Sequence, residues 1–255
     1  MPPLPQSLQA LSESVRLGPD VPCLVVRPEG VPLGGSNRAV PFLFWMHGRT
    51  AFKELDPGRY LRLARAGIGS CAIDLPGHGE RGSEAGMRAE AVFDNIERAA
   101  LEIDDVVNAL GRRGFDLDRM AIGGMSMGGM VALVRLCRPH RFRAAILEAT
   151  SGNWRVQHQR QFFDHESADR LDPIAHLDRW REIPVLAVHS RGDEWIDFEG
   201  QSAFLDEVRR RATRPEDVEL MALEETGAPH EHLGFGRRTN EVKNRELEFL
   251  SRHLT

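Results

Sequence analysis

The stretch MAIGGMSMGGMVAL at residues 120–133 carries four glycines and a single serine between two apolar runs. A flexible linker would be polar, and a buried strand rarely contains glycine, because a residue without a side chain weakens strand packing. We therefore expect a strand over 120–125, a sharp turn at Ser126, and a helix that begins at Met127.

The spacing Gly124-Met125-Ser126-Met127-Gly128 follows the pattern G-x-S-x-G, which between a strand and a helix is typical of a nucleophilic serine. The helix has to pass close to the neighbouring strand, so a side chain two positions before or after the serine has no room. The helix N-terminus also brings backbone N–H groups to the place where an oxyanion would form. A phosphate-binding loop is excluded, because neither the Walker spacing nor G-x-G-x-x-G fits this stretch.

Short apolar runs alternate with helical patterns along most of the chain. The runs from residue 40 onward are apolar on both faces, which is typical of parallel strands covered by helices. This alternation predicts an α/β fold with one domain over 1–255, a mostly parallel sheet of about seven or eight strands, and helices on both faces. The predicted strands are 22–28, 40–47, 67–76, 120–125, 144–150, 183–190 and 217–224.

Composition limits the partners of the chain. A formal net charge of -5 without a block of Lys or Arg argues against a nucleic-acid or membrane partner. The three cysteines match no zinc spacing, and their odd number predicts reduced thiols. No apolar run could span a bilayer and the N-terminus lacks a signal pattern, so we expect a cytoplasmic protein. We expect neither a metal nor a cofactor, and the sequence leaves both a monomer and a homo-oligomer open.

A serine nucleophile needs a base to take its proton and an acid to orient that base. The carboxyl ends of parallel strands are where ligands bind in such sheets, and Asp193 follows the strand 183–190. We prefer Asp193 as the acid to Asp197, which has the position of a helix N-cap. Glu148, at the end of an earlier strand, is the alternative acid in a variant layout, but we expect it to support the serine turn.

The base is expected among two histidines that follow the strand 217–224. We prefer His230, because it lies nearer the end of the strand. The short segment between the strand and His230 can return the chain over Ser126, so His230 is the first histidine that can reach the serine. Glu231 should then point away from the site. His232 stays open, either as the alternative base or as a residue of the substrate pocket.

The oxyanion hole should combine the backbone N–H of Met127 with one from the loop after the strand 40–47, for which we expect Arg49. His47 in that loop is expected to hold the loop by hydrogen bonding. The segment 151–182 is longer than a crossover needs, which favours a cap over the pocket. Its aromatic residues Trp154, Phe162 and Phe163 are expected to face the acyl group, with packing on the body as the alternative.

These residues resemble the α/β-hydrolase fold family, and within it the compact carboxylesterases and acyl hydrolases close to dienelactone hydrolases and prolyl-oligopeptidase catalytic domains. The family pattern has Gly-His where this chain has Pro229-His230, and a small residue where it has Arg81, which predicts a more polar entrance. The likeness rests on HGRT (47–50), DLPGHGERG (74–82), GMSMG (124–128), HSRGDEWID (189–197) and GAPHEHLG (227–234).

The resemblance implies a serine hydrolase that needs no cofactor. We expect a carboxylesterase that cleaves a small-molecule ester, or a thioester, through an acyl intermediate on Ser126. A peptidase for small acyl-peptides and a non-catalytic ligand receptor on the same fold are the alternatives.

Overall fold

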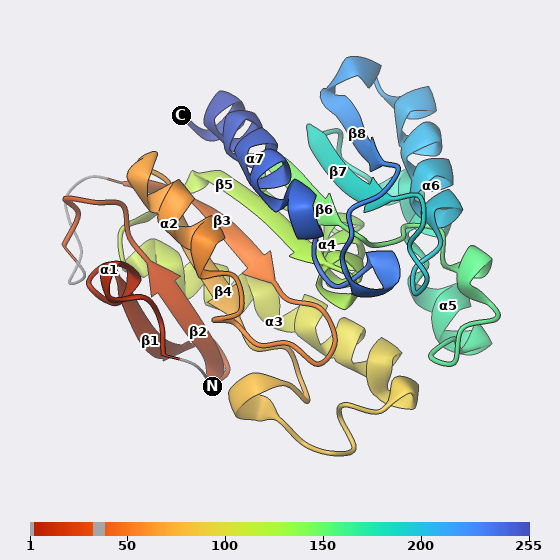
Figure 1. Ribbon diagram of the computed structural model, residues 1–255, viewed down its shortest axis with the longest axis horizontal. Coiled ribbons are helices and arrows are strands. Elements are labelled where there is room, and N and C mark those ends of the chain that lie inside the picture. Colours follow the sequence, from red (N-terminus) through yellow and green to blue (C-terminus); the bar gives the residue numbers. More distant parts are fainter. Residues whose placement is uncertain (1–2, 33–38) are drawn as a thin grey trace.

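A single eight-stranded sheet forms the centre of the computed structural model, which describes residues 3–32 and 39–255 (Figure 1). The strand order is β1-β2-β4-β3-β5-β6-β7-β8, and β2 runs antiparallel to β1 and β4 while the other neighbours are parallel. This confirms the predicted mostly parallel sheet. The strands are β1 (Ser12–Leu17), β2 (Val21–Val26), β3 (Val40–Met46), β4 (Gly69–Ile73), β5 (Phe115–Met125), β6 (Ala144–Glu148), β7 (Val185–Ser190) and β8 (Val218–Leu223).

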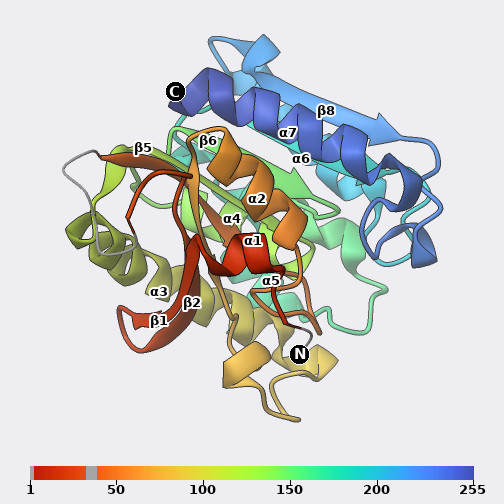
Figure 2. The same ribbon diagram turned by 60° about the vertical axis from the view of Figure 1, so that its left-hand side comes forward.

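Helices cover both faces of the sheet. Figures 1 and 2 show α1, α2 and α7 on one side and α3 and α4 on the other, and α6 packs with α3 and α4 in the same apolar cluster. The α-helices are α1 (Gln6–Gln9), α2 (Pro57–Arg65), α3 (Val92–Arg112), α4 (Met127–Leu136), α5 (His165–Leu171), α6 (Phe198–Arg211) and α7 (Thr239–Leu254). Short 3-10 helices are η1 (Gly79–Arg81), η2 (Ala89–Ala91), η3 (Trp154–Gln157), η4 (Pro173–Arg179), η5 (Pro215–Asp217), η6 (Pro229–Glu231) and η7 (Gly236–Arg238).

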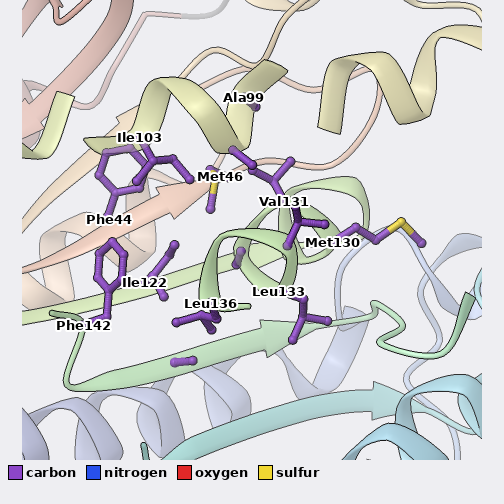
Figure 3. Packing of buried hydrophobic residues seen from close by; sticks show 14 of the residues in the cluster. Phe44, Met46, Ala99, Ile103, Ile122, Met130, Val131, Leu133, Leu136 and Phe142 are labelled. Atoms are coloured by element: carbon purple, nitrogen blue, oxygen red, sulfur yellow. The ribbon is translucent and has the colours of Figure 1, made fainter. Parts of the chain in front are cut away.

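Alternate residues of the central strands serve two separate apolar cores, one on each face. On β3, Phe44 and Met46 belong to the core under α3 and α4, whereas Trp45 belongs to the core under α2 and α7. Figure 3 shows Phe44 and Met46 in one cluster with Ile103 of α3 and Val131 of α4. Because both faces of β3 are buried, its sequence reads as a continuous apolar run.

Strand β1 escaped the sequence analysis, and the reason is its place at the edge of the sheet. Among the described strands it pairs only with β2, and Leu17 is the one buried residue of β1. Helix α3 continues past Gly111 and ends at Arg112. Helix α2 begins after the N-cap residue Asp56, whose Oδ1 accepts a hydrogen bond from Arg59 N at 3.2 Å.

All three cysteines are buried free thiols, as predicted. Among the described residues, no helix is both long and apolar enough to cross a membrane. The segment 151–182 forms η3, α5 and η4 between β6 and β7.

Candidate active site

Ser126 occupies a strained turn between β5 and α4. Its φ of 53° and ψ of -120° place a non-glycine residue in a sparsely populated conformation, which is typical of functional sites. A Cβ on Gly124 would lie 2.3 Å from the carbonyl carbon of Gly128, so any side chain there would clash with α4. The expected reason for glycine at this position is therefore confirmed.

Two hydrogen bonds to the backbone of Ser126 hold this turn against the end of β6 and the residues that follow it. Ser126 N donates to Glu148 O at 2.8 Å, and the hydroxyl of Thr150 donates to Ser126 O at 2.8 Å. The Glu148 carboxylate is buried and pairs with Arg59 at 2.7 Å and Lys243 at 2.8 Å. Burial raises the pKa of Glu148, but these two cations outweigh it and lower the pKa to about 2. Glu148 thus supports the serine turn, as expected, and lies outside the acid position.

Ser126, His232 and Asp193 form one continuous chain of hydrogen bonds. His232 Nε2 lies 3.0 Å from Ser126 Oγ, and His232 Nδ1 lies 2.7 Å from Asp193 Oδ2. All three residues are at most 9% exposed, and the exclusion of water strengthens each hydrogen bond. The three residues follow the chain order serine, acid, histidine that the sequence analysis expected.

His230 does not reach the serine, so the preferred choice of His230 is corrected by the structure. Its Nδ1 lies 2.9 Å from Glu194 Oε2, its ring stacks on Trp195, and its side chain is 50% exposed. The physical reason is a reversal of the chain, in which His230 and Glu231 both have positive φ. This turn directs His230 outward, and His232, the open alternative, points inward.

Asp193 is held by donors on both of its oxygens. Oδ1 accepts from the backbone N–H groups of Trp195 and Ile196 at 2.8 Å each, and Oδ2 faces His232 and His189. Burial raises the pKa of Asp193, but hydrogen bonds from His189, His232 and Ile196 lower it to about 2. Asp193 is therefore ionised at neutral pH, as an acid that orients a histidine must be.

His189, the buried fifth residue of β7, also belongs to the site, although it was not predicted from the sequence. Its Nε2 lies 3.2 Å from Asp193 Oδ2 and 3.1 Å from Ile196 O. Both partners are acceptors, so this nitrogen carries the proton and donates to the carboxylate. A histidine directly before the loop of Asp193, in the run HSRGD, was the signal that could have revealed it.

Asp197 has the N-cap position of α6, but its carboxylate makes no capping hydrogen bond. It instead pairs with Arg160 at 2.7 Å. The predicted helix start is therefore right, and the predicted capping role is wrong. The carboxylate serves to attach the segment 151–182 to the loop after β7.

The loop after β3 passes directly against the serine, because a Cβ on Gly48 would lie 3.3 Å from Ser126 Cβ. His47 Nδ1 donates to Gly48 O at 2.7 Å, and its Nε2 accepts from Leu75 N at 3.1 Å. Burial lowers the pKa of His47 to about 4, so the ring is neutral and fixes this loop as expected. Met127 opens α4, where a helix leaves its N–H groups without intrahelical partners.

A cavity of about 630 Å³ opens above Ser126, with Arg49, Met127 and His232 in its wall. It crosses the edge of the sheet, so residues of both apolar cores line it. The α3/α4 side contributes Val92, Met127, Met130, Phe162 and Ile196, and the α2/α7 side contributes Trp45, Tyr60, Met125 and Phe235. The serine thus has apolar space on each side.

Of the three aromatic residues expected to face the substrate, only Phe162 lines this cavity. Trp154 is fully buried, donates its indole N–H to Ser151 O at 2.8 Å, and packs on Phe93. Phe163 also packs on Phe93, with ring centroids 6.2 Å apart. For these two residues the alternative of packing on the body is correct, because η3 begins against the core side of α3.

The segment 151–182 reaches the cavity through Arg160, Gln161 and Phe162. Arg81, in contrast, forms a bidentate pair with Glu102 and contributes nothing to the cavity wall, so the expected polar entrance at this residue is wrong. Within the described part of the chain, no group of three or more His, Cys, Asp or Glu residues is arranged to hold a metal ion.

Comparisons with known proteins give a consistent result. A family model described as the prolyl oligopeptidase family matches residues 58–255. The chain is 25% identical over 253 residues to the esterase YjfP of Escherichia coli, which covers 92% of this chain and 96% of that protein. Its structure is similar to TT1662 from Thermus thermophilus, with a TM-score of 0.70, 22% identity, and coverage of 95% of this chain and 97% of the other.

A larger enzyme shares the same fold. The acylaminoacyl peptidase of Pyrococcus horikoshii is similar with a TM-score of 0.73 and 17% identity, over 95% of this chain but 41% of the peptidase. Together with the sheet described above, these likenesses confirm the α/β-hydrolase fold. The family model spans more than half of the chain, so the chain is a hydrolase that belongs to the prolyl oligopeptidase family.

Proposed function

We propose that this protein hydrolyses carboxylic esters through an acyl intermediate on Ser126, with His232 as the base and Asp193 as the acid that orients it. The observation that carries the proposal is the hydrogen-bonded chain from Ser126 Oγ through the ring of His232 to Asp193. A serine hydroxyl becomes a strong nucleophile only in such an arrangement.

In the acylation step, His232 Nε2 takes the hydroxyl proton while Ser126 Oγ bonds to the carbonyl carbon of the ester. The carbonyl oxygen becomes negative and is stabilised by the backbone N–H groups of Met127 and Arg49. The C–O bond to the alcohol then breaks, and His232 passes its proton to the departing alcohol. Water repeats the sequence on the acyl-enzyme, releasing the acid and restoring the serine.

Asp193 acts on His232 alone in this scheme. By accepting a hydrogen bond from Nδ1–H it leaves Nε2 free to receive the serine proton, and its negative charge stabilises the imidazolium that forms. The low pKa of Asp193 keeps that charge in place at neutral pH. Hydrogen bonds from His189 and two backbone N–H groups hold the carboxylate in one orientation.

The cavity supports a small apolar ester as the substrate. Its volume of about 630 Å³ falls in the range of small-molecule sites, and apolar side chains line it on both sides of Ser126. An ester has two parts, an acyl group and an alcohol, and each would find apolar space on one side of the nucleophile. YjfP is named an esterase, and the match to this chain covers nearly the whole of that protein. This similarity also favours an ester over a peptide as the substrate. A thioester would react by the same steps.

A peptidase is the second candidate, because the family model is that of a peptidase family. The chain corresponds to only about two fifths of the acylaminoacyl peptidase. The two activities are separated by comparing p-nitrophenyl esters with aminoacyl p-nitroanilides. We expect the esters to be turned over faster by at least two orders of magnitude, and faster cleavage of the anilides would favour the peptidase.

The nucleophile is tested with Ser126→Ala, and Ser14→Ala on the exposed edge strand β1 is the matched control. Ser126→Ala should lower kcat for p-nitrophenyl butyrate by roughly 10⁴- to 10⁶-fold and abolish labelling by a fluorophosphonate. Ser14→Ala should retain both. Retention of a tenth of the wild-type rate by Ser126→Ala would exclude Ser126 from the mechanism.

A further inference from the structure

The turn before His232 contains two consecutive non-glycine residues in the left-handed backbone region. His230 has a φ of 55° and Glu231 a φ of 48°, and L side chains disfavour this region because Cβ crowds the next carbonyl oxygen. Across the turn, His232 N donates to Pro229 O at 3.2 Å. Such a turn persists only where contacts from outside hold it.

The carboxylate of Glu231 provides such contacts, because it accepts four hydrogen bonds. Oε2 accepts from the hydroxyl of Ser190 at 2.7 Å, and from the backbone N–H and the hydroxyl of Thr226 at 2.8 Å each. Oε1 accepts from Gly227 N at 2.7 Å. Partial burial raises the pKa of Glu231, but these hydrogen bonds outweigh it and lower the pKa to about 2. The carboxylate is therefore ionised at neutral pH, and every donor that faces it is uncharged.

Ser190 connects this carboxylate to the other side of the candidate site. It is the last residue of β7, and its carbonyl accepts from Asp193 N at 3.3 Å. A Cβ on Gly192 would lie 3.4 Å from Glu231 Cγ, so the loop of Asp193 and the loop of His232 are in contact here. The hydrogen bond between Ser190 and Glu231 thus joins the two loops close to the residues they carry.

We propose that Glu231 is a positioning residue that holds His232 between Asp193 and Ser126 by locking the histidine loop to the end of β7. Glu231 affects turnover in this way only if hydrolysis proceeds through Ser126, as proposed above.

A glutamate suits this position because its oxygens can only accept, and the N–H group of Thr226 that faces one oxygen and the N–H group of Gly227 that faces the other can only donate. A glutamine at 231 would turn its own NH₂ group toward at least one of these donors, whichever way the amide is oriented. Such a contact replaces an attraction by a repulsion and leaves a donor unpaired. The turn would then relax, and the ring of His232 would move with it.

The test compares Glu231→Gln with Glu224→Gln. Glu224 lies on the same connection after β8, and its exposed carboxylate pairs with the exposed Arg191 at 2.9 Å. Glu224→Gln therefore makes the same change from carboxylate to amide as Glu231→Gln, but it breaks only an exposed ion pair. Glu231→Gln should lower kcat for p-nitrophenyl butyrate by on the order of 10²-fold with KM unchanged, since a displacement of about 1 Å has an effect of that size. Glu224→Gln should keep the wild-type kcat.

A proton NMR spectrum provides a readout that does not depend on turnover. The Nδ1–H that His232 directs at Asp193 gives a downfield resonance, which should shift or vanish in Glu231→Gln and persist in Glu224→Gln. A Glu231→Gln protein that keeps both the wild-type kcat and this resonance overturns the proposal. If the wild type fails to hydrolyse any ester, the proposed function fails, and the resonance alone still decides the role of Glu231.

Ser190→Ala replaces Glu231→Gln if that variant does not fold. It removes one of the four hydrogen bonds and should lower kcat by about 3- to 10-fold, which corresponds to the loss of one net hydrogen bond. An unchanged kcat together with an unchanged downfield resonance in Ser190→Ala would count against the role of Glu231.

Discussion

Replacing each histidine of the loop after β8 with asparagine separates the two rings by function. Asparagine suits both positions, because it tolerates the positive φ of His230 and keeps a short polar group near Asp193 in place of His232. The pair of variants therefore makes the same chemical change two residues apart, once inside and once outside the hydrogen-bonded chain that ends at Ser126.

The structure predicts very different magnitudes for these variants. Among the described residues, His232 is the base that is hydrogen-bonded to Ser126 Oγ, and loss of a triad member lowers kcat by roughly 10⁴- to 10⁶-fold. That corresponds to about 5–8 kcal/mol of transition-state stabilisation. His230 takes part only in an exposed pair with Glu194, of which the side chains are 50% and 64% exposed. An exposed ion pair contributes at most about 1 kcal/mol of free energy. Loss of the pair in His230→Asn would therefore lower kcat by less than about fivefold, even if all of this free energy acted on turnover.

The assay measures kcat and KM for p-nitrophenyl butyrate, the rate of fluorophosphonate labelling, and the Tm of each variant. We expect His232→Asn to lose turnover and labelling with an unchanged fold, and His230→Asn to keep both. Loss of labelling in His230→Asn with retention in His232→Asn would refute the base assignment. It would mean that the loop rearranges in solution to bring His230 to the serine.

Two further predictions concern the acid and the cavity. The pKa of Asp193 is lowered to about 2 in the folded state, so its ionised carboxylate contributes about 2 kcal/mol to the free energy of unfolding. This contribution is complete above about pH 4 and is lost as the pH falls toward 2. Urea unfolding between pH 5 and 2 should therefore give a free energy of unfolding that falls with pH less steeply in Asp193→Asn than in the wild type, and equal slopes would contradict this ionisation. Phe162→Ala should shift the preference among p-nitrophenyl esters toward longer acyl chains, because Phe162 lines the cavity. Phe163→Ala should instead lower the free energy of unfolding by about 1–2 kcal/mol, because it removes packing on Phe93, and should leave the chain-length preference unchanged. The opposite pattern in the chain-length panel and the melting curves would reverse these assignments.

Features that depend on neighbouring residues in the chain could be derived without the structure. The glycines around Ser126 reveal the strand–turn–helix because the clash they avoid involves residues only four positions apart, Gly124 and Gly128. Strands buried on both faces show as continuous apolar runs. Strand β1 was missed because an edge strand buries too little apolar surface to leave such a run.

Features that depend on the direction of a side chain were decided by the tertiary structure. The order of serine, acid and histidine is visible in the sequence. The choice between His230 and His232 depends on the positive φ angles of two non-glycine residues, which the amino-acid sequence does not predict. The same holds for Phe162 and Trp154, of which one lines the cavity and the other fills the core. Glu231 was expected to point away from the site and does not line the cavity, but only the structure shows that its carboxylate binds Ser190.

The physical reason for this division is the range of the interactions. Steric exclusion and apolar periodicity act between residues a few positions apart, so the amino-acid order alone contains them. A hydrogen bond such as that between His232 and Ser126, which are 106 positions apart, exists only after the sheet has brought the ends of β5, β7 and β8 to one edge. The sequence therefore determined which chemistry the chain can perform, and the packing of three loops decided which side chains are placed to perform it.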